Sequence, residues 1–98
     1  SEMCIRDRMK RIIAVHFPNL DQEVADACIE AFYRFRRVDG IEKKPATREL
    51  INWIRALKAD PDFDVSSLSR GDVPYLGVFF KKSTDLAMAS KMIARSQN

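Results

Sequence analysis

The strongest constraint on the fold is a series of apolar residues that recurs with the period of an α-helix. In segment 21–37 these residues are Val24, Cys28, Ala31, Phe32 and Phe35. Because a helix turns once in about 3.6 residues, their side chains share one face. Asn19 or Asp21 can cap the start of this helix, and Gly40 can end it in a left-handed conformation. The segment therefore predicts an amphipathic helix with one face turned to a core.

Three other segments have the same apolar period. The first, residues 9–17, ends at Pro18, because a proline forces the preceding residue out of the helical region. The second is expected to begin with Thr47 as its N-cap and to end before Pro61, and the third to begin at residue 83 or 84. Their predicted inner faces are Met9, Ile12, Ile13 and His16, then Leu50, Ile51, Ile54 and Leu57, and finally Leu86, Ala89, Met92 and Ile93.

Two stretches are less regular. Residues 60–74 are rich in turn formers, and their apolar side chains are expected to contact the core: Phe63, Val65 and Leu68. Residues 75–82 have Phe79 and Phe80 at helical spacing from Leu76, which favours a short helix, although so brief an apolar run also fits a strand. We therefore expect an all-α fold, a small bundle of four to five helices.

Length and composition agree with one small globular domain. The 98 residues are 46% hydrophobic and 32% charged, unlike a disordered chain, and a net charge of +3 is compatible with phosphate-containing partners. No apolar run approaches the ~18 residues of a membrane helix. Cys4 and Cys28 are too few for a disulfide scaffold or metal site, and Cys28 is expected to be a buried thiol. A reducing, cytoplasmic location is expected.

The first eight residues stand apart from the rest. The stretch MCIRDR, residues 3–8, resembles the translated remnant of a sequencing adaptor at the end of an assembled metagenomic reading frame. On this interpretation residues 1–8 are a non-native lead-in, the domain comprises residues 9–98, and the native chain was cut just before Met9. The alternative is a short polar segment that leads into the first helix.

The sequence contains no recognisable catalytic constellation. His16, the one histidine, adjoins a Phe-Pro pair and is expected to be a packing or capping residue. No base is identifiable that would activate a serine of the loop at residues 66–69. A phosphate loop of the GxxxxGK[ST] type is missing, and no metal site is predicted. The chain alone is therefore expected to turn nothing over.

Basic residues gather around the start of the third predicted helix. Lys43 and Lys44 precede it, and Arg48 falls in its first turn, where the helix dipole disfavours a cation. Arg48 is then either a solvated side chain or one that points at an anion held nearby. A third interpretation is a DNA-recognition helix, because Asn52 and Arg55 share its polar side, although the preceding connection is long for a helix-turn-helix.

Taken together, residues 9–95 resemble the C-terminal lid domain of MoxR-type AAA+ ATPases. The central match is KKPATRELINW, residues 43–53, which is similar to a KPST-x-EL-x-x-W-like motif of one branch of the family. The flanking matches are Ile12-Ile13, His16-Phe17-Pro18, Ala31-Phe32-Tyr33, Leu76-Gly77-Val78, Lys81 and Asp85-Leu86.

The resemblance implies a lid that closes over ATP and Mg²⁺ bound by an α/β domain upstream of this chain. It implies that Arg48 is the sensor 2 arginine, which contacts the γ-phosphate. Lys43 and Lys44 would face the nucleotide or a neighbouring subunit, with a solvated loop as the alternative. Because the Walker motifs would lie upstream, this chain alone should hold no cofactor and be inactive.

The family also implies partners. Its members form homo-oligomeric rings, usually hexamers, and couple hydrolysis to chaperone-like remodelling, often beside a protein with a von Willebrand A domain. In such an assembly Phe79 and Phe80 would belong to an exposed surface that packs on the α/β domain, whereas Trp53, Phe32 and Phe35 would lie in the core. The alternative functions are a small basic DNA-binding module and a free-standing protein-interaction module; a nucleic-acid partner is not expected.

Overall fold

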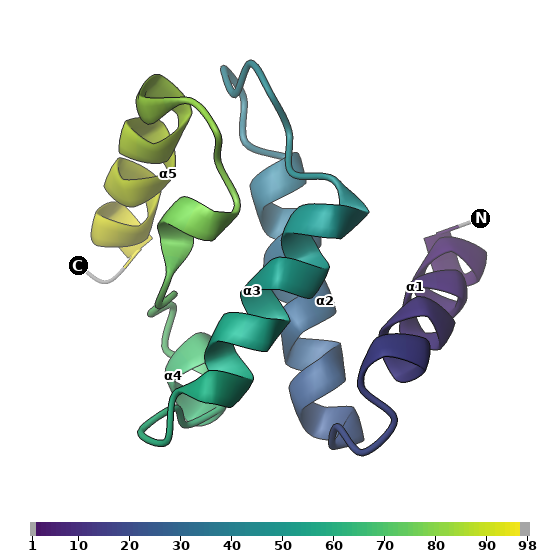
Figure 1. Cartoon of the computed structure of the whole chain (residues 1–98). Coiled ribbons are helices and arrows are strands. Elements are labelled where there is room, and N and C mark those ends of the chain that lie inside the picture. The colour runs from purple at the N-terminus through teal and green to yellow at the C-terminus, as the bar shows by residue number, and fades with distance from the viewer. Residues whose placement is uncertain (1, 97–98) are drawn as a thin grey trace.

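The computed structural model describes the backbone of residues 2–96 and the side chains of residues 4–96. Over this range the chain is helical, with no strand (Figure 1). The elements are α1 (Glu2–His16), α2 (Gln22–Arg36), α3 (Thr47–Ala59), α4 (Ser66–Ser69), the 3-10 helix η1 (Leu76–Val78) and α5 (Ser83–Ser96). The predicted all-α bundle is confirmed. None of the helices in this part of the chain is long and apolar enough to cross a membrane.

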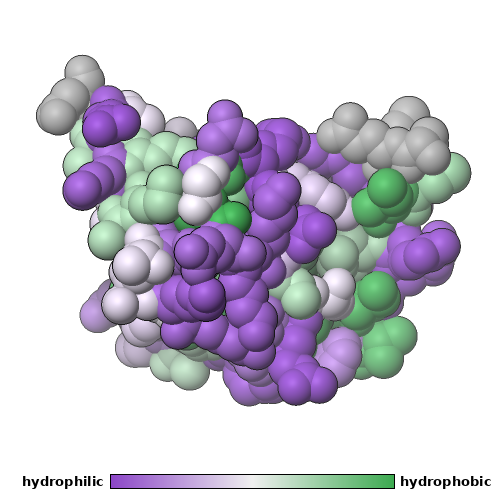
Figure 2. Space-filling view, turned by 90° about the horizontal axis from the view of Figure 1, so that it is seen from above, coloured by the Kyte–Doolittle hydropathy of each residue, from purple (hydrophilic) through white to green (hydrophobic). Residues whose placement is uncertain are grey.

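Helix α2 is the centre of the bundle. It contacts α1, α3 and α4, while η1 packs on α3 and α5 packs on η1. In Figure 1, α1 and α5 lie on opposite sides of the α2–α3 pair, and the α2–α3 connection rises at the end where α5 begins. This end is hydrophilic over its middle, and its apolar side chains are concentrated toward α1 (Figure 2).

The core is organised around an aromatic cluster. The rings of Trp53 and Phe79 have centroids 4.6 Å apart, and the ring of Phe35 lies 5.5 Å from Phe79. Phe80 meets Phe35 edge-on at 5.7 Å, and Phe32 lies 6.4 Å from Phe79. Aromatic pairs of this kind contribute about 0.5–1.5 kcal/mol beyond the burial of their surface. The prediction of a core position for Trp53, Phe32 and Phe35 is confirmed.

The expectation that Phe79 and Phe80 form an exposed surface is wrong. Their side chains are 1% and 5% exposed. The segment that carries them turns inward after Tyr75, which adopts a left-handed conformation with φ of 58°. This turn lets the backbone carbonyl of Pro74 accept a hydrogen bond of 2.7 Å from Nε1 of the buried Trp53. The indole N–H is thereby satisfied, which makes burial of this ring possible.

The starts of the first two helices differ in detail from the sequence predictions. Helix α1 begins at Glu2 instead of near Met9, because no helix breaker precedes Met9 and Arg6 pairs with Glu30 of α2 at 2.9 Å. The interpretation of residues 1–8 as non-native stays a prediction. Asp21 occupies the N-cap position of α2, but its side chain makes no cap bond.

The predicted stop and cap around loop 37–46 are also corrected. Gly40 has a positive φ of 89°, but α2 already ends at Arg36, so this glycine shapes the loop and does not cap the helix. Thr47 is the first residue of α3, and Ala46 takes the N-cap position. The free backbone N–H of Ala46 is satisfied from inside the helix, by Oε1 of Glu49 at 3.0 Å.

The two less regular stretches of the sequence each contain one short helical element. Helix α4 lies within residues 60–74, and its Leu68 is buried in the core as predicted, while Phe63 is only partly buried. In segment 75–82 the structure has η1 and no strand. The predicted inner face of α5 is confirmed in outline, since Ala89 is buried and its other members are partly buried: Leu86, Met92 and Ile93.

Replacing Trp53 by phenylalanine should lower the free energy of unfolding by about 2 kcal/mol, because it leaves a cavity and an unpaired Pro74 carbonyl. Urea unfolding followed by far-ultraviolet circular dichroism measures this change. The control is Tyr75→Phe, which removes an exposed hydrogen bond to Asp60 and should change stability far less. Equal losses in the two variants would contradict the central role of Trp53.

Replacing Gly40 by alanine should destabilise the chain by about 1–2 kcal/mol, because the new side chain must adopt a positive φ. The added Cβ would also lie 2.4 Å from Cε of Met88. The matched control is Gly77→Ala, whose nearest neighbour would be Leu86 at an ordinary 3.9 Å. Thermal unfolding of both variants tests this account, and an equal melting temperature would refute it.

Candidate functional site

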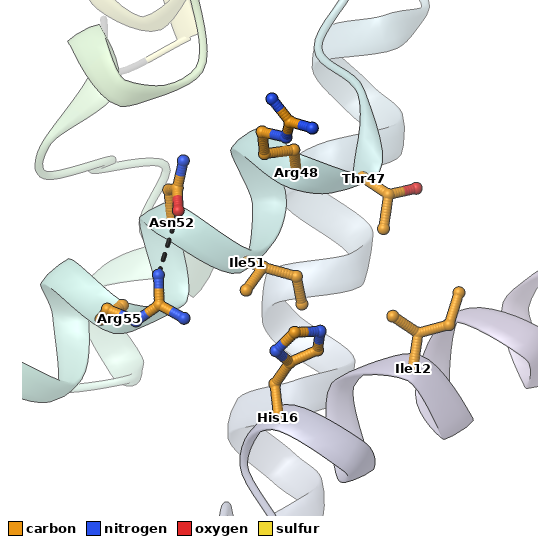
Figure 3. A pocket seen from close by; sticks show the side chains of 7 residues that line it. All are labelled: Ile12, His16, Thr47, Arg48, Ile51, Asn52 and Arg55. Atoms are coloured by element: carbon orange, nitrogen blue, oxygen red, sulfur yellow. Dashed lines mark hydrogen bonds between the residues drawn. The ribbon is translucent and has the colours of Figure 1, made fainter.

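A groove of about 400 Å³ lies between α1 and α3. In Figure 3, Ile12 and His16 of α1 point toward α3, and Ile51 of α3 points back toward them. The lining residues are Ile12, His16, Thr47, Arg48, Ile51, Asn52 and Arg55. The groove therefore combines apolar side chains with two arginines and a histidine.

Arg48 is the least engaged cation of this groove. Its side chain is exposed, and it makes no hydrogen bond or ion pair with any residue that the structure describes. Figure 3 shows it at the end of the groove farther from His16. The buried Glu49 supplies the negative charge that the start of α3 favours. The carboxylate of Glu49 accepts a hydrogen bond from the backbone N–H of Ala46 and does not pair with Arg48. The guanidinium of Arg48 is therefore available to an external anion.

Asn52 and Arg55, two other polar residues of the groove, are partners of each other. Nη1 of Arg55 donates to Oδ1 of Asn52 at 3.1 Å, and the guanidinium lies 5.9 Å from the ring centroid of Phe17. His16 is exposed at the end of α1, with its ring centroid 6.2 Å from that of Phe17. These contacts orient Arg55 along α3. The predicted place of His16 on the inner face of α1 is wrong, because its side chain is exposed and its ring contact is with the next residue.

The two predicted lysines lie in loop 37–46 just before this groove. The side chains of Lys43 and Lys44 are exposed and are not paired with a carboxylate among the residues that the structure describes. Pro45, the next residue, is fully buried. The backbone of the loop is therefore anchored in the protein, while the side chains of both lysines extend into solvent.

A buried polar contact that the sequence does not predict is the carboxylate of Asp85. This side chain is 1% exposed, and it accepts the backbone N–H groups of Glu42 at 2.9 Å and Lys43 at 3.0 Å. Asp85 entered the sequence analysis only as part of a family match. An acidic residue in the first turn of a helix is common, so no local pattern indicated a partner so distant in the chain.

Neither Cys28 nor Ser66 has the surroundings of an activated nucleophile. Burial raises the pKa of the Cys28 thiol to about 12, which keeps it protonated at neutral pH. Ser66 donates to Oδ2 of Asp64 at 2.8 Å, and its backbone N–H also bonds to that carboxylate. These hydrogen bonds lower the pKa of Asp64, so it is a turn-forming carboxylate and a weak base. No cluster of metal ligands occurs among the described residues.

Comparisons of the chain with protein-family models, with curated proteins and with solved structures found no match. The interpretation of the groove therefore depends on its geometry and on the sequence motifs around Arg48.

Iodoacetamide at about pH 8 should modify Cys4 and leave Cys28 intact in the folded chain, because alkylation requires the thiolate. Cys4 is exposed, whereas the Cys28 side chain is fully buried with a pKa of about 12. Mass spectrometry of tryptic peptides measures the two rates. In guanidinium chloride both thiols should react, which provides the control. Equal rates in the folded chain would show that α2 does not bury this thiol.

Proposed function

We propose that this chain is the helical lid of a MoxR-type AAA+ ATPase. In the complete enzyme it closes over ATP and Mg²⁺ held by an upstream α/β domain, and Arg48 contacts the γ-phosphate. The observation that carries this proposal is the exposed Arg48 in the first turn of α3, which has no partner among the described residues. The all-α architecture and the groove beside Arg48 support it.

The chemistry of the side chain suits this role. A guanidinium is always charged at physiological pH and offers a planar fork of N–H donors that matches phosphate oxygens. Phosphoryl transfer depends on electrostatic stabilisation of charge spread over the γ-phosphoryl oxygens. Arg48 supplies that charge from the lid, so hydrolysis and release of the γ-phosphate change the force that holds the lid closed.

Other parts of the proposal concern the assembly. Lys43 and Lys44 extend from loop 37–46 toward the nucleotide or a neighbouring subunit. The enzyme is a cytoplasmic homo-oligomeric ring, a hexamer, that performs chaperone-like remodelling with a partner that carries a von Willebrand A domain. This assembly follows from the family resemblance, and the exposed cations of loop 37–46 are compatible with it.

In the complete ATPase, Arg48→Ala should lower kcat about 100-fold, which corresponds to ~3 kcal/mol of lost transition-state stabilisation. Steady-state ATP hydrolysis by the ring measures this effect. The control is Arg95→Ala, which removes an exposed arginine in the last turn of α5 and should leave kcat unchanged. If Arg48→Ala hydrolyses ATP as fast as the wild type, Arg48 does not have this role.

A further inference from the structure

The loop that carries Lys43 and Lys44 is held by a carboxylate from the other end of the chain. Asp85, in the first turn of α5, is almost completely buried and accepts the backbone N–H groups of Glu42 and Lys43, one with each oxygen. A buried ionised carboxylate is costly unless such donors satisfy it. The two hydrogen bonds therefore fix both the carboxylate and the loop backbone.

The loop is also fixed on the far side of the two lysines. Nη1 of Arg36, at the end of α2, donates to the backbone carbonyl of Pro45. One residue later, the N–H of Ala46 donates to the carboxylate of Glu49 in α3. Hydrogen bonds before and after Lys43–Lys44 thus come from three different helices, α5, α2 and α3. The backbone has little freedom there, although both side chains reach solvent.

Two further contacts join α5, or the residue just before it, to this loop. Lys82 donates to Oε2 of Glu42, and this contact raises the pKa of Lys82. Cε of Met88 lies so close to Gly40 that a Cβ there would be 2.4 Å away. The Lys82–Glu42 pair is exposed and contributes little to stability. Asp85 is the buried member of this set, so it is the contact on which the loop position depends.

We infer that Asp85 is a positioning residue for polyphosphate binding. By holding the backbone at residues 42 and 43, it fixes Lys43 and Lys44 just before the start of α3, so that they and Arg48 form one preorganised cationic surface. A loop that is already ordered loses less conformational entropy when it binds. This inference rests on the proposed function, because it assumes that Arg48 binds phosphate. It adds that α5 controls this binding without touching the ligand.

The sign of the expected effect separates positioning from simple electrostatics. Asp85 carries a negative charge beside a surface proposed to bind an anion. If charge alone mattered, its removal would strengthen binding of an anion. If Asp85 holds the lysines in place, its removal weakens binding. The Asp85→Asn variant therefore distinguishes the two roles by the direction of the change.

The experiment uses the 98-residue chain with inorganic tripolyphosphate as the probe, and isothermal titration calorimetry at low salt measures the affinity. Asp85→Asn should weaken binding about tenfold. The control is Asp72→Asn, which makes the same charge change at an exposed carboxylate between α4 and η1, away from loop 37–46 in Figure 1, and should leave affinity unchanged. Hydrogen exchange at the amides of Glu42 and Lys43 should also become faster in Asp85→Asn.

An Arg48→Ala variant separates failure of this inference from failure of the proposed function. If Arg48→Ala weakens binding but Asp85→Asn does not, Arg48 binds phosphate and the positioning role of Asp85 is refuted. If Asp85→Asn weakens binding but Arg48→Ala does not, the positioning role stands for the two lysines and Arg48 is not part of this phosphate-binding surface. A wild-type chain that does not bind tripolyphosphate would overturn the inference, whereas the proposed function, in which the upstream domain holds the nucleotide, is tested by ATP hydrolysis in the complete enzyme.

A second variant covers loss of folding in Asp85→Asn, which circular dichroism would reveal. Asp85→Glu retains the charge but adds a methylene group, so the carboxylate no longer fits the two N–H donors. Weaker binding by a folded Asp85→Glu supports the inference, and affinity equal to that of the wild type refutes it.

Discussion

The packing of Trp53 against Phe79 is the contact on which the rest of the structure depends. It joins α3 to the segment that leads into α5, and Phe79 also reaches Phe35 of α2. A buried indole needs an acceptor, and the carbonyl of Pro74 provides it. Tyr75 adopts a left-handed conformation between these two contacts. This turn of the chain lets the Pro74 carbonyl bond to the indole N–H of Trp53 and lets Phe79 pack on the indole ring. The core therefore determines an unusual backbone conformation at the surface.

The same packing determines where the basic residues lie. With η1 held against α3, α5 begins beside loop 37–46, where Asp85 binds the loop backbone. Glu49 then complements the start of α3 from within the helix, which leaves Arg48 exposed. The carboxylates of Asp85 and Glu49 both accept backbone N–H groups. Neither carboxylate pairs with a cationic side chain in the described part of the chain. Lys43, Lys44 and Arg48 are all exposed as a result, and the proposed anionic ligand would contact them.

The parts of the fold that sequence could predict are those with a local cause. Helical spacing identified the buried faces of α2 and α3 because a long amphipathic helix repeats its signal several times. The short run around Phe79 and Phe80 was assigned to the surface, because its burial depends on Trp53 and Phe35, which lie elsewhere in the chain. The spacing of apolar residues also could not show whether Ala46 or Thr47 would be the N-cap of α3, since both positions fit the pattern.

The candidate site divides in the same way. Arg48 and the lysines could be identified from sequence, because cations around the start of a helix are locally visible. Asp85 could not be connected to them, because its partners are backbone N–H groups that any residue would offer. The groove likewise depends on the approach of α1 to α3, which places Ile12 beside Ile51. A tertiary arrangement of this kind leaves no local trace in the sequence.

The most direct test of the central claim is long-read sequencing of the encoding DNA upstream of the Met9 codon. The account predicts that the reading frame continues into a strand, a GxxxxGK[ST] loop and a Walker-type carboxylate, so that residues 1–8 are an artefact and Arg48 belongs to an ATPase lid. A genuine start codon and ribosome-binding site just upstream would contradict it. The chain would then be a free-standing helical domain, and Arg48 would have no nucleotide to contact.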